Sequence, residues 1–398
     1  MAAQLADQYA RAGNAARAIE HYHQAAEVAA RIFAHAEAIR LHRAALEQHS
    51  ALRPGADRDR LEVRTLTSMA ASLNALRGYS DAELESTLER TVSLAERLSQ
   101  RATLGDALVA LWASRFVQGD ISGAHRLALR AIELADTTPG GADEALIGQV
   151  HFAMAGSSLS LGRPATAVRH FETTIAHATD EQSLSIGSHP AIHARAWSAH
   201  GYWLLGEAAT AEANAAEAID RARAVEHPYS LTIALAYASV TWQLLAEWER
   251  LERCTVELEE LSTRHGFAYY PEWGRVLGGW ARDDADGTAR MEQGLARLRA
   301  ARAFSRMPYW LSLLAQRSGP DRARAVLDSA VVSARARDDR WWLPEVLRLR
   351  AGLSTGQTAA NALREALALA EQQGSIPLAE RCRADLAALR TPAERSPS

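Results

Sequence analysis

The chain has 398 residues with 44 basic and 48 acidic side chains, a formal net charge of −4, and no lysine. Every basic residue is therefore arginine, which excludes a P-loop lysine, a Schiff-base lysine and a lysine general base. The near-balanced charge also disfavours direct binding of nucleic acid. Hydrophobic residues make up 48% but aromatic ones only 6%. The apolar residues are mostly alanine and leucine, which are strong helix formers, so we expect an all-α chain.

Cysteine content and hydropathy bear on the compartment. Cys254 and Cys382 lie too far apart in the sequence to indicate a disulfide framework or a cysteine zinc site. Asp7 and Arg11 interrupt the stretch where a signal peptide would need its apolar core. The longest weakly polar stretch, 230–246, is too short and too polar to span a bilayer. We therefore expect a cytoplasmic protein with no membrane contact.

One pattern recurs along the chain: small and apolar residues, a bulky residue, a glycine turn, and then a helix with regularly spaced alanines. It occurs at 5–29, more weakly at 68–95, and then at 112–135, 154–178 and 198–222. Alanine lets the two helices of a pair cross closely, and glycine ends the first helix. Four further helix pairs with the same arrangement of small and bulky residues follow at 241–266, 278–300, 308–334 and 341–389. They lack the turn glycine, except that the pair at 308–334 turns at Gly319-Pro320.

This pattern resembles the tetratricopeptide repeat, a helix–turn–helix unit. The resemblance implies an all-α, right-handed superhelical solenoid of about eight to ten helix pairs. The turn glycines at 78, 119, 162 and 206 are 41, 43 and 44 residues apart. That exceeds the usual repeat of about 34 residues, so we expect longer helices or looser connections. We expect one solenoid over 1–390, subdivided, if at all, near 54–58 and 267–272, and a disordered tail at 391–398.

Both ends of the repeat region are similar to a narrower group of proteins. The opening at 5–46, and Trp341-Trp342 followed by 345–352, resemble the C-terminal repeat region of bacterial STAND-type signalling ATPases. That group includes LuxR-type and antibiotic-regulator-type transcription factors and adenylate-cyclase-associated ATPases. The resemblance implies a region that senses a signal or partner and restrains an ATPase. Without lysine the chain has no P-loop, so we expect only the regulatory half, as a stand-alone relative or as a fragment.

Histidine and tryptophan gather before the turn at Gly206. His193, Trp197 and His200 lie at i, i+4 and i+7, on one face of a helix. Counted from each turn glycine, five residues fall where tetratricopeptide repeats line their concave groove. These predicted groove contacts are His193, His200, Trp203, Phe152 and Phe116. Such a groove favours an extended peptide or a flat small ligand, and ordinary core packing is the alternative.

Two other patterns favour structural roles. His35, His42 and His49 recur every seven residues, whereas metal ligation on a helix prefers i, i+4, so we expect solvated or partly packed histidines. The run 283–287 resembles a calcium loop, but Arg282 breaks the spacing. We expect a polar turn there, with Asp286 capping the next helix.

The tryptophans near the C-terminal end have two readings. Trp310, Trp341 and Trp342 are either exposed anchors for a partner or packed in the core, and we favour the core.

The sequence contains no catalytic motif of the Gly-x-Ser-x-Gly, His-Glu-x-x-His or Cys–His kind, and we predict no catalytic, cofactor or metal site. We expect a non-enzymatic regulatory or sensor scaffold that recognises a protein segment in its groove. Its partner would be a protein or peptide, such as an ATPase or regulator encoded nearby. The alternative is a sensor of a small-molecule inducer using the same groove. A weaker alternative is an enzyme that uses the histidine–tryptophan cluster.

Overall fold

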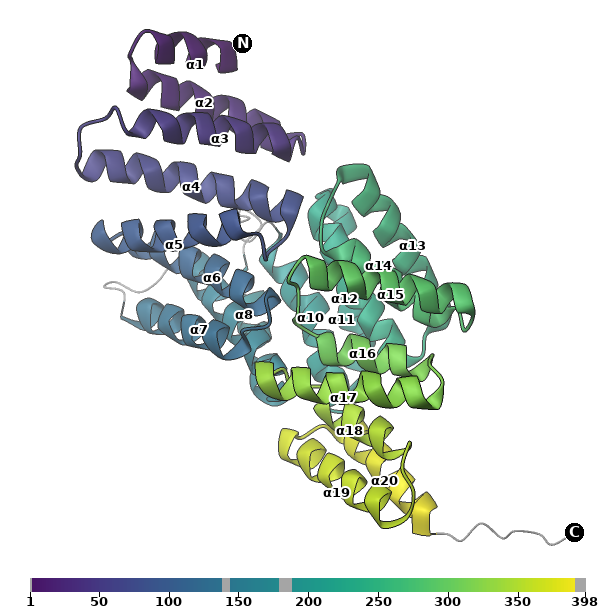
Figure 1. The fold of residues 1–398 in the computed structure, drawn as a ribbon. Helices are drawn as coiled ribbons and strands as arrows, with labels where there is room; N and C mark the ends of the chain where they lie inside the picture. The colour runs from purple at the N-terminus through teal and green to yellow at the C-terminus, as the bar shows by residue number, and fades with distance from the viewer. Residues whose placement is uncertain (1, 138–143, 179–187, 391–398) are drawn as a thin grey trace, which may run out of the picture.

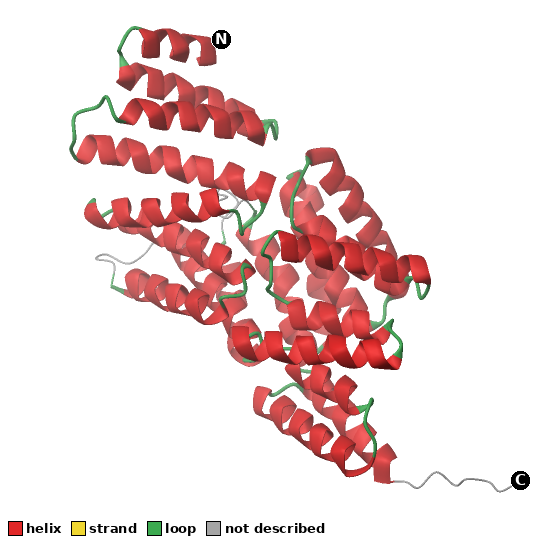
Figure 2. Cartoon of the chain, in the orientation of Figure 1, coloured by secondary structure: helices red, strands yellow, loops and turns green. Residues whose placement is uncertain are grey.

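The computed structural model describes residues 2–137, 144–178 and 188–390. Within these ranges every regular element is an α-helix, twenty in all, and Figure 2 shows them without a strand. The helices stack side by side into a superhelix with the two ends of the chain far apart (Figure 1). In the described part of the chain eighteen helices form nine consecutive pairs with one further helix at each end, so the predicted all-α, tetratricopeptide-repeat-like solenoid of about eight to ten pairs is confirmed. The predicted disordered tail at 391–398 lies outside the described residues.

The first ten helices are α1 (Ala2–Arg11), α2 (Ala15–Arg31), α3 (His35–His49), α4 (Ala56–Arg77), α5 (Ala82–Arg97), α6 (Arg101–Val117), α7 (Ile121–Asp136), α8 (Glu144–Ser160), α9 (Pro164–Ala176) and α10 (Pro190–Leu204). The second ten are α11 (Ala208–Ala224), α12 (Pro228–Leu245), α13 (Trp248–His265), α14 (Tyr270–Ala281), α15 (Ala285–Ala300), α16 (Met307–Gln316), α17 (Pro320–Arg337), α18 (Leu343–Ala351), α19 (Gly356–Gln373) and α20 (Ile376–Arg390).

Even-numbered and odd-numbered helices form two layers. The even-numbered helices from α6 to α14 contact one another directly along the inner side of the superhelix. Each odd-numbered helix from α3 to α19 packs between its two even-numbered neighbours in the chain, and α1 packs on α2. The alanines of the repeat pattern lie where the helices cross, and those at 18, 124, 167 and 211 are completely buried. Small side chains at these crossings allow the close packing that the pattern predicted.

The superhelix closes on itself, because loops of its second turn rest on helix ends of its first. The carbonyl oxygen of Val117, at the end of α6, accepts a hydrogen bond from the backbone N–H of Phe304, before α16, at 2.8 Å. The carbonyl oxygen of Ser160, at the end of α8, accepts one from Arg340, before α18, at 2.7 Å. Each contact joins two helices whose numbers differ by ten, so ten helices, or five helix pairs, complete one turn of the superhelix. We call this row of contacts the seam.

One further contact extends the seam toward the N-terminus, and another lies between the two contacts already described. The backbone N–H of Ala268, before α14, donates to the carbonyl oxygen of Ala75 in α4 at 3.4 Å. The guanidinium of Arg337 donates to the carbonyl oxygen of Gln118 at 3.0 Å. The last carbonyls of a helix lack intrahelical partners and carry the negative end of its dipole. Backbone N–H groups and arginines are therefore stabilising at these ends.

The turn glycines occur where the seam needs them. Gly78, Gly119, Gly162 and Gly206 all have φ between 78° and 83°. A Cβ on Gly119 would lie 3.0 Å from the Cβ of Phe304, and one on Gly206 would lie 3.3 Å from that of Ile376. After α12 the equivalent left-handed turn residue is Ala246, with φ 61°, and it is exposed. Glycine is thus required where a positive φ coincides with close approach of another loop.

The core runs as one cluster from α3 to α20, while α1–α3 form a smaller cluster of their own. The subdivisions predicted near 54–58 and 267–272 stay predictions. Trp310, Trp341 and Trp342 are 0–2% exposed, so their core packing is confirmed. No helix in the described part of the chain has the length and apolar character needed to cross a bilayer.

The acidic turn before α15 is a helix cap, but its capping residue differs from the prediction. Asp284 is the N-cap, and its Oδ1 accepts a hydrogen bond from the backbone N–H of Gly287 at 2.6 Å. Asp286 lies inside the first helical turn, where its charge favours the helix dipole. The prediction of Asp286 as the cap was therefore wrong by two residues.

Candidate functional site

The five predicted groove contacts all lie on inner helices. They are Phe116 on α6, Phe152 on α8, and His193, His200 and Trp203 on α10. The rings of Phe152 and His193 are 4.6 Å apart, and Trp197 lies 5.3 Å from Phe116 and 5.7 Å from Phe152. The helical spacing and the count from the turn glycines thus select side chains that share one aromatic cluster. All five are buried, however, with 0–5% of their surface exposed.

The seam covers these residues. Trp203 packs against Trp342 with ring centroids 5.9 Å apart, and the guanidinium of Arg381 lies 5.2 Å from the Trp203 ring centre. Further in, the loop before α16 lies against the cluster. A partner reaches these side chains only if the seam opens, so their role as groove contacts stays a prediction.

Arg306, in that loop, fills the centre of the inner surface. Its side chain is buried, with only 2% of the residue exposed. The guanidinium carbon lies 5.1–5.4 Å from the centres of four aromatic rings. These rings belong to Trp197, Tyr237, Trp273 and Trp341. A cation at this distance from ring faces is attracted by their quadrupoles, and the attraction is strongest where water is excluded. We call this arrangement the arginine cage.

Two polar contacts fix Arg306 in the cage. Its backbone N–H donates to Oδ2 of Asp339 at 2.6 Å, which holds the left-handed conformation at φ 61°. Its guanidinium donates to Nδ1 of His200 at 3.3 Å, while Nε2 of His200 donates to the carbonyl oxygen of Tyr237 at 2.9 Å. These two hydrogen bonds assign the proton of the neutral imidazole to Nε2.

Burial dominates the electrostatics of the cage. Desolvation, with a further contribution from Arg306, lowers the pKa of His193 to about 3 and that of His200 well below its usual value. Desolvation raises the pKa of Asp339 to about 6, against the opposing effect of Arg306. At neutral pH both imidazoles are therefore uncharged, so the guanidinium is not repelled by its neighbours.

Little space remains between the arginine cage and the rings of α6 and α8. The cavity lined by Phe116, Phe152, His193 and Trp197 has a volume of about 20 Å³. That is room for about one water molecule. The aromatic cluster does not admit a peptide in this conformation.

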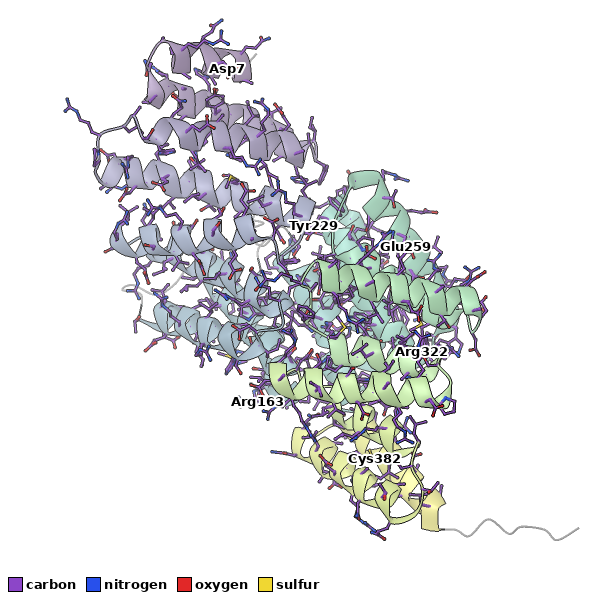
Figure 3. The ribbon with its side chains drawn as sticks, in the orientation of Figure 1. Asp7, Arg163, Tyr229, Glu259, Arg322 and Cys382 are labelled. Atoms are coloured by element: carbon purple, nitrogen blue, oxygen red, sulfur yellow. The ribbon has the colours of Figure 1, made fainter. Side chains whose placement is uncertain are left out.

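An open pocket of about 530 Å³ lies elsewhere on the inner side, between the N-terminal hairpins and the start of α12. Figure 3 labels Tyr229, one of its lining residues, where the purple-blue N-terminal helices meet the teal-green ones. The remaining lining residues come from α2 to α4 and the loop before α12. They are Ala26, Glu27, Ala30, Arg31, Phe33, His35, His42, Ser68, Ala71, Ser72, Ala75 and His227. We call this the entrance pocket.

The heptad-spaced histidines lie in and beside this pocket. His42 and His49 are buried, His35 is half-buried, and burial lowers the pKa of all three. The prediction of partly packed histidines is confirmed, and that of solvated ones was wrong because α3 lies between α2 and α4. Over the described ranges, no three histidine, cysteine, aspartate or glutamate side chains are placed to hold a metal ion.

Sequence reasoning missed the arginine cage and the entrance pocket. Arg306 lies in a short loop with no periodicity, and its ring partners come from four different helices and loops. A signal for the pocket did exist in the sequence. Ala26 and Ala30, and likewise Ala71 and Ala75, are spaced four residues apart, which places each pair of small side chains on one helix face.

Comparison with known proteins supports the fold alone and assigns no family or function. No family model matches the chain, and no curated protein matches it in sequence. Among solved structures, a Rap protein complexed with competence and sporulation factor has a TM-score of 0.58 at 11% identity, over 94% of this chain and 97% of that one. Yeast Tom70 has a TM-score of 0.31 at 12% identity, over 98% of this chain and 92% of that one. The chain therefore shares the tetratricopeptide-repeat-like fold of the Rap structure.

Proposed function

We propose that this protein is a non-enzymatic binding scaffold that recognises a segment of a protein partner on its inner surface. It would act as the regulatory or sensor module of a bacterial signalling or transcription-regulatory system, with an ATPase or regulator as the partner. The fold supports this role, because stacked helical repeats present extended binding surfaces. The Rap structure, with the same fold, was solved as a complex with competence and sporulation factor.

The observation that carries the proposal is the arginine cage. Loop 302–306 of the chain itself lies on the inner surface, with Arg306 inserted among four rings. An extended partner segment bearing an arginine has the chemistry to replace this loop. Such a segment would then contact His193 and His200, which flank the cage, and Trp203, Phe152 and Phe116 farther out.

Affinity capture with matched tryptophan variants tests this proposal. The wild-type chain, Trp203→Leu and Trp248→Leu would each be used as bait in extract from the source organism. Trp248 is the control because it is 50% exposed and lies on the outer helix α13. We expect one protein to be retained by the wild type and the control and lost by Trp203→Leu, with circular dichroism showing that all baits are folded. Retention of that protein by Trp203→Leu and by His193→Gln would contradict recognition on the inner surface.

The second candidate function is the sensing of a small molecule. One observation favours it: the entrance pocket of about 530 Å³ is open in the same conformation in which the aromatic cluster is sealed. Its volume falls in the range of about 300–1,000 Å³ that is usual for small-ligand sites.

A further inference from the structure

The entrance pocket lies at the N-terminal end of the seam, where the two turns of the superhelix are not joined by backbone hydrogen bonds between residues that the structure describes. Helices α2 and α12 are ten apart, like the pairs that the seam joins. Among the described residues, however, no backbone hydrogen bond links the end of α2 to the loop before α12. Ring contacts take its place: Phe33 lies 5.2 Å from His265 and 6.0 Å from His227. The two turns of the superhelix therefore face each other here across a pocket.

The walls of the pocket suit a compact apolar group. The methyl groups of Ala26 and Ala30 lie on one face of α2, and those of Ala71 and Ala75 on one face of α4. The rings of Phe33 and Tyr229 complete the apolar lining. Alanine at these positions leaves the volume that a larger side chain would fill, so a flat or branched hydrocarbon group finds both space and contact surface.

The charges of the lining favour an anion. Glu27 is neutralised by Arg64, whose guanidinium lies 3.0 Å from its carboxylate. Arg31, at the mouth, has no ion-pair partner within the described part of the chain. The lining of the pocket therefore carries one unpaired positive charge, on Arg31, whereas its carboxylate, on Glu27, is already paired. A ligand carboxylate would form a charge-assisted hydrogen bond with Arg31.

His42 provides a second polar contact. It is 2% exposed and lines the pocket, and its Nδ1 finds no hydrogen-bond partner among the residues described. Burial lowers the pKa of His42 to about 4, so the imidazole is neutral at pH 7 and carries one N–H. A buried polar atom without a partner is unfavourable, and a ligand oxygen would satisfy the ring.

We infer that the entrance pocket binds a small apolar carboxylic acid in its ionised form, with the hydrocarbon part against the alanines and rings and the carboxylate against Arg31 and His42. This inference rests on the second candidate function, small-molecule sensing, and is independent of partner recognition at the arginine cage. Because the lining comes from both turns of the superhelix, the bound acid bridges the open end of the seam.

Calorimetric titration of the full chain with matched acids and amides tests the inference. The probes are naphthalene-1-acetate, 4-phenylbutyrate and decanoate, each beside its neutral primary amide. We expect at least one acid to bind, and its amide to bind about tenfold more weakly, because the amide lacks the charge that Arg31 recognises. Arg31→Gln should reduce the affinity for the acid to that for the amide. Arg17→Gln, an exposed arginine on the same helix paired with Glu20, should leave both unchanged.

A pocket-filling variant separates the ligand class from the function. Ala71→Leu places a larger side chain in the floor and should weaken acid and amide alike. Equal affinities for acid and amide, or an acid affinity unaffected by Arg31→Gln, would overturn the carboxylate but leave a small-molecule site. Binding unaffected by Ala71→Leu would place the ligand outside the entrance pocket and overturn the inference, but would leave small-molecule sensing. Failure of every probe to bind would overturn the small-molecule function itself.

Discussion

Replacing Arg306 by alanine, methionine and lysine separates the contributions of its charge and its volume. Truncation of a large buried side chain to alanine costs about 2–5 kcal/mol. The four ring contacts add to this loss, whereas release of a buried charge into water offsets part of it. We expect Arg306→Ala to lower the free energy of unfolding by about 4 kcal/mol.

The other two variants keep most of the volume. Methionine fills the cage without a charge, and we expect a loss of about 2 kcal/mol from the missing cation–ring attraction. Lysine keeps the charge but lacks the planar fork that lies among the rings and donates to His200, so a loss of about 1–2 kcal/mol is expected. All three replacements keep a non-glycine residue at φ 61°, so backbone strain cancels between them. Arg302→Met, at an exposed left-handed position in the same loop, is the control and should change stability by less than about 0.5 kcal/mol.

Urea unfolding followed by tryptophan fluorescence and circular dichroism measures these differences. Trp197, Trp273 and Trp341 contact Arg306, so fluorescence reports the cage while circular dichroism reports the helices. If Arg306→Met were as stable as the wild type or more stable, the charge would contribute nothing net. The argument for recognition of a cationic segment on the inner surface would then fail.

Two further predictions concern the seam and the buried histidines. Gly119→Ala should lower the free energy of unfolding by about 2–4 kcal/mol, because the positive φ is strained and the new Cβ clashes with Phe304. Gly266→Ala has open space around it and should lower the free energy of unfolding by only about 1 kcal/mol, from the φ strain alone. Thermal unfolding measures both, and equal losses would argue against the close contact at Gly119. Three buried imidazoles have a pKa of about 3 to 4: His23, His42 and His193. Because these values are depressed below about 6.5, stability is full above that pH and falls as pH decreases toward 4, by on the order of 2 kcal/mol per group at pH 5. Asp339, with a pKa raised to about 6, acts in the opposite direction and offsets about 1 kcal/mol. An unfolding temperature that is unchanged or higher at pH 5 than at pH 7.5 would contradict this.

The hairpins could be predicted because their determinants are local. Alanine spacing, left-handed glycine turns and proline at the first position of α10 and α12 all act within one or two helices. The unusual repeat length also has a local cause: α6, α7 and α8 have 16–17 residues each. Loss of the glycine after residue 206 was visible in the sequence, but its reason, the exposure of Ala246, required the structure.

The seam could not be predicted, because its contacts join residues far apart in the chain. Ser122 donates to Asp338 across 216 positions, and Arg337 donates to Gln118 across 219. No periodicity in a single sequence encodes such pairs. The same limit explains the site: helical spacing placed Phe116, Phe152 and the α10 residues on the inner face, but their burial depends on loops of the next superhelical turn.

A disulfide across the seam tests most directly whether the superhelix is closed. A Cβ on Gly78 would lie 3.8 Å from the Cβ of Ala268, which matches the usual spacing of about 3.8 Å in disulfides. Cys254 and Cys382 are buried and do not compete. We predict that the double variant Gly78→Cys, Ala268→Cys forms the bond completely under mild oxidation, and that small-angle X-ray scattering gives the same radius of gyration before and after. Cysteine at Gly78, where φ is 81° and ψ is 173°, costs about 1–3 kcal/mol of backbone strain, so circular dichroism of the reduced double variant is the control that the helices are intact. With wild-type helix content in the reduced form, failure of the bond to form, or a radius that shrinks when it forms, would show that the turns stand apart in solution and would contradict the closed seam.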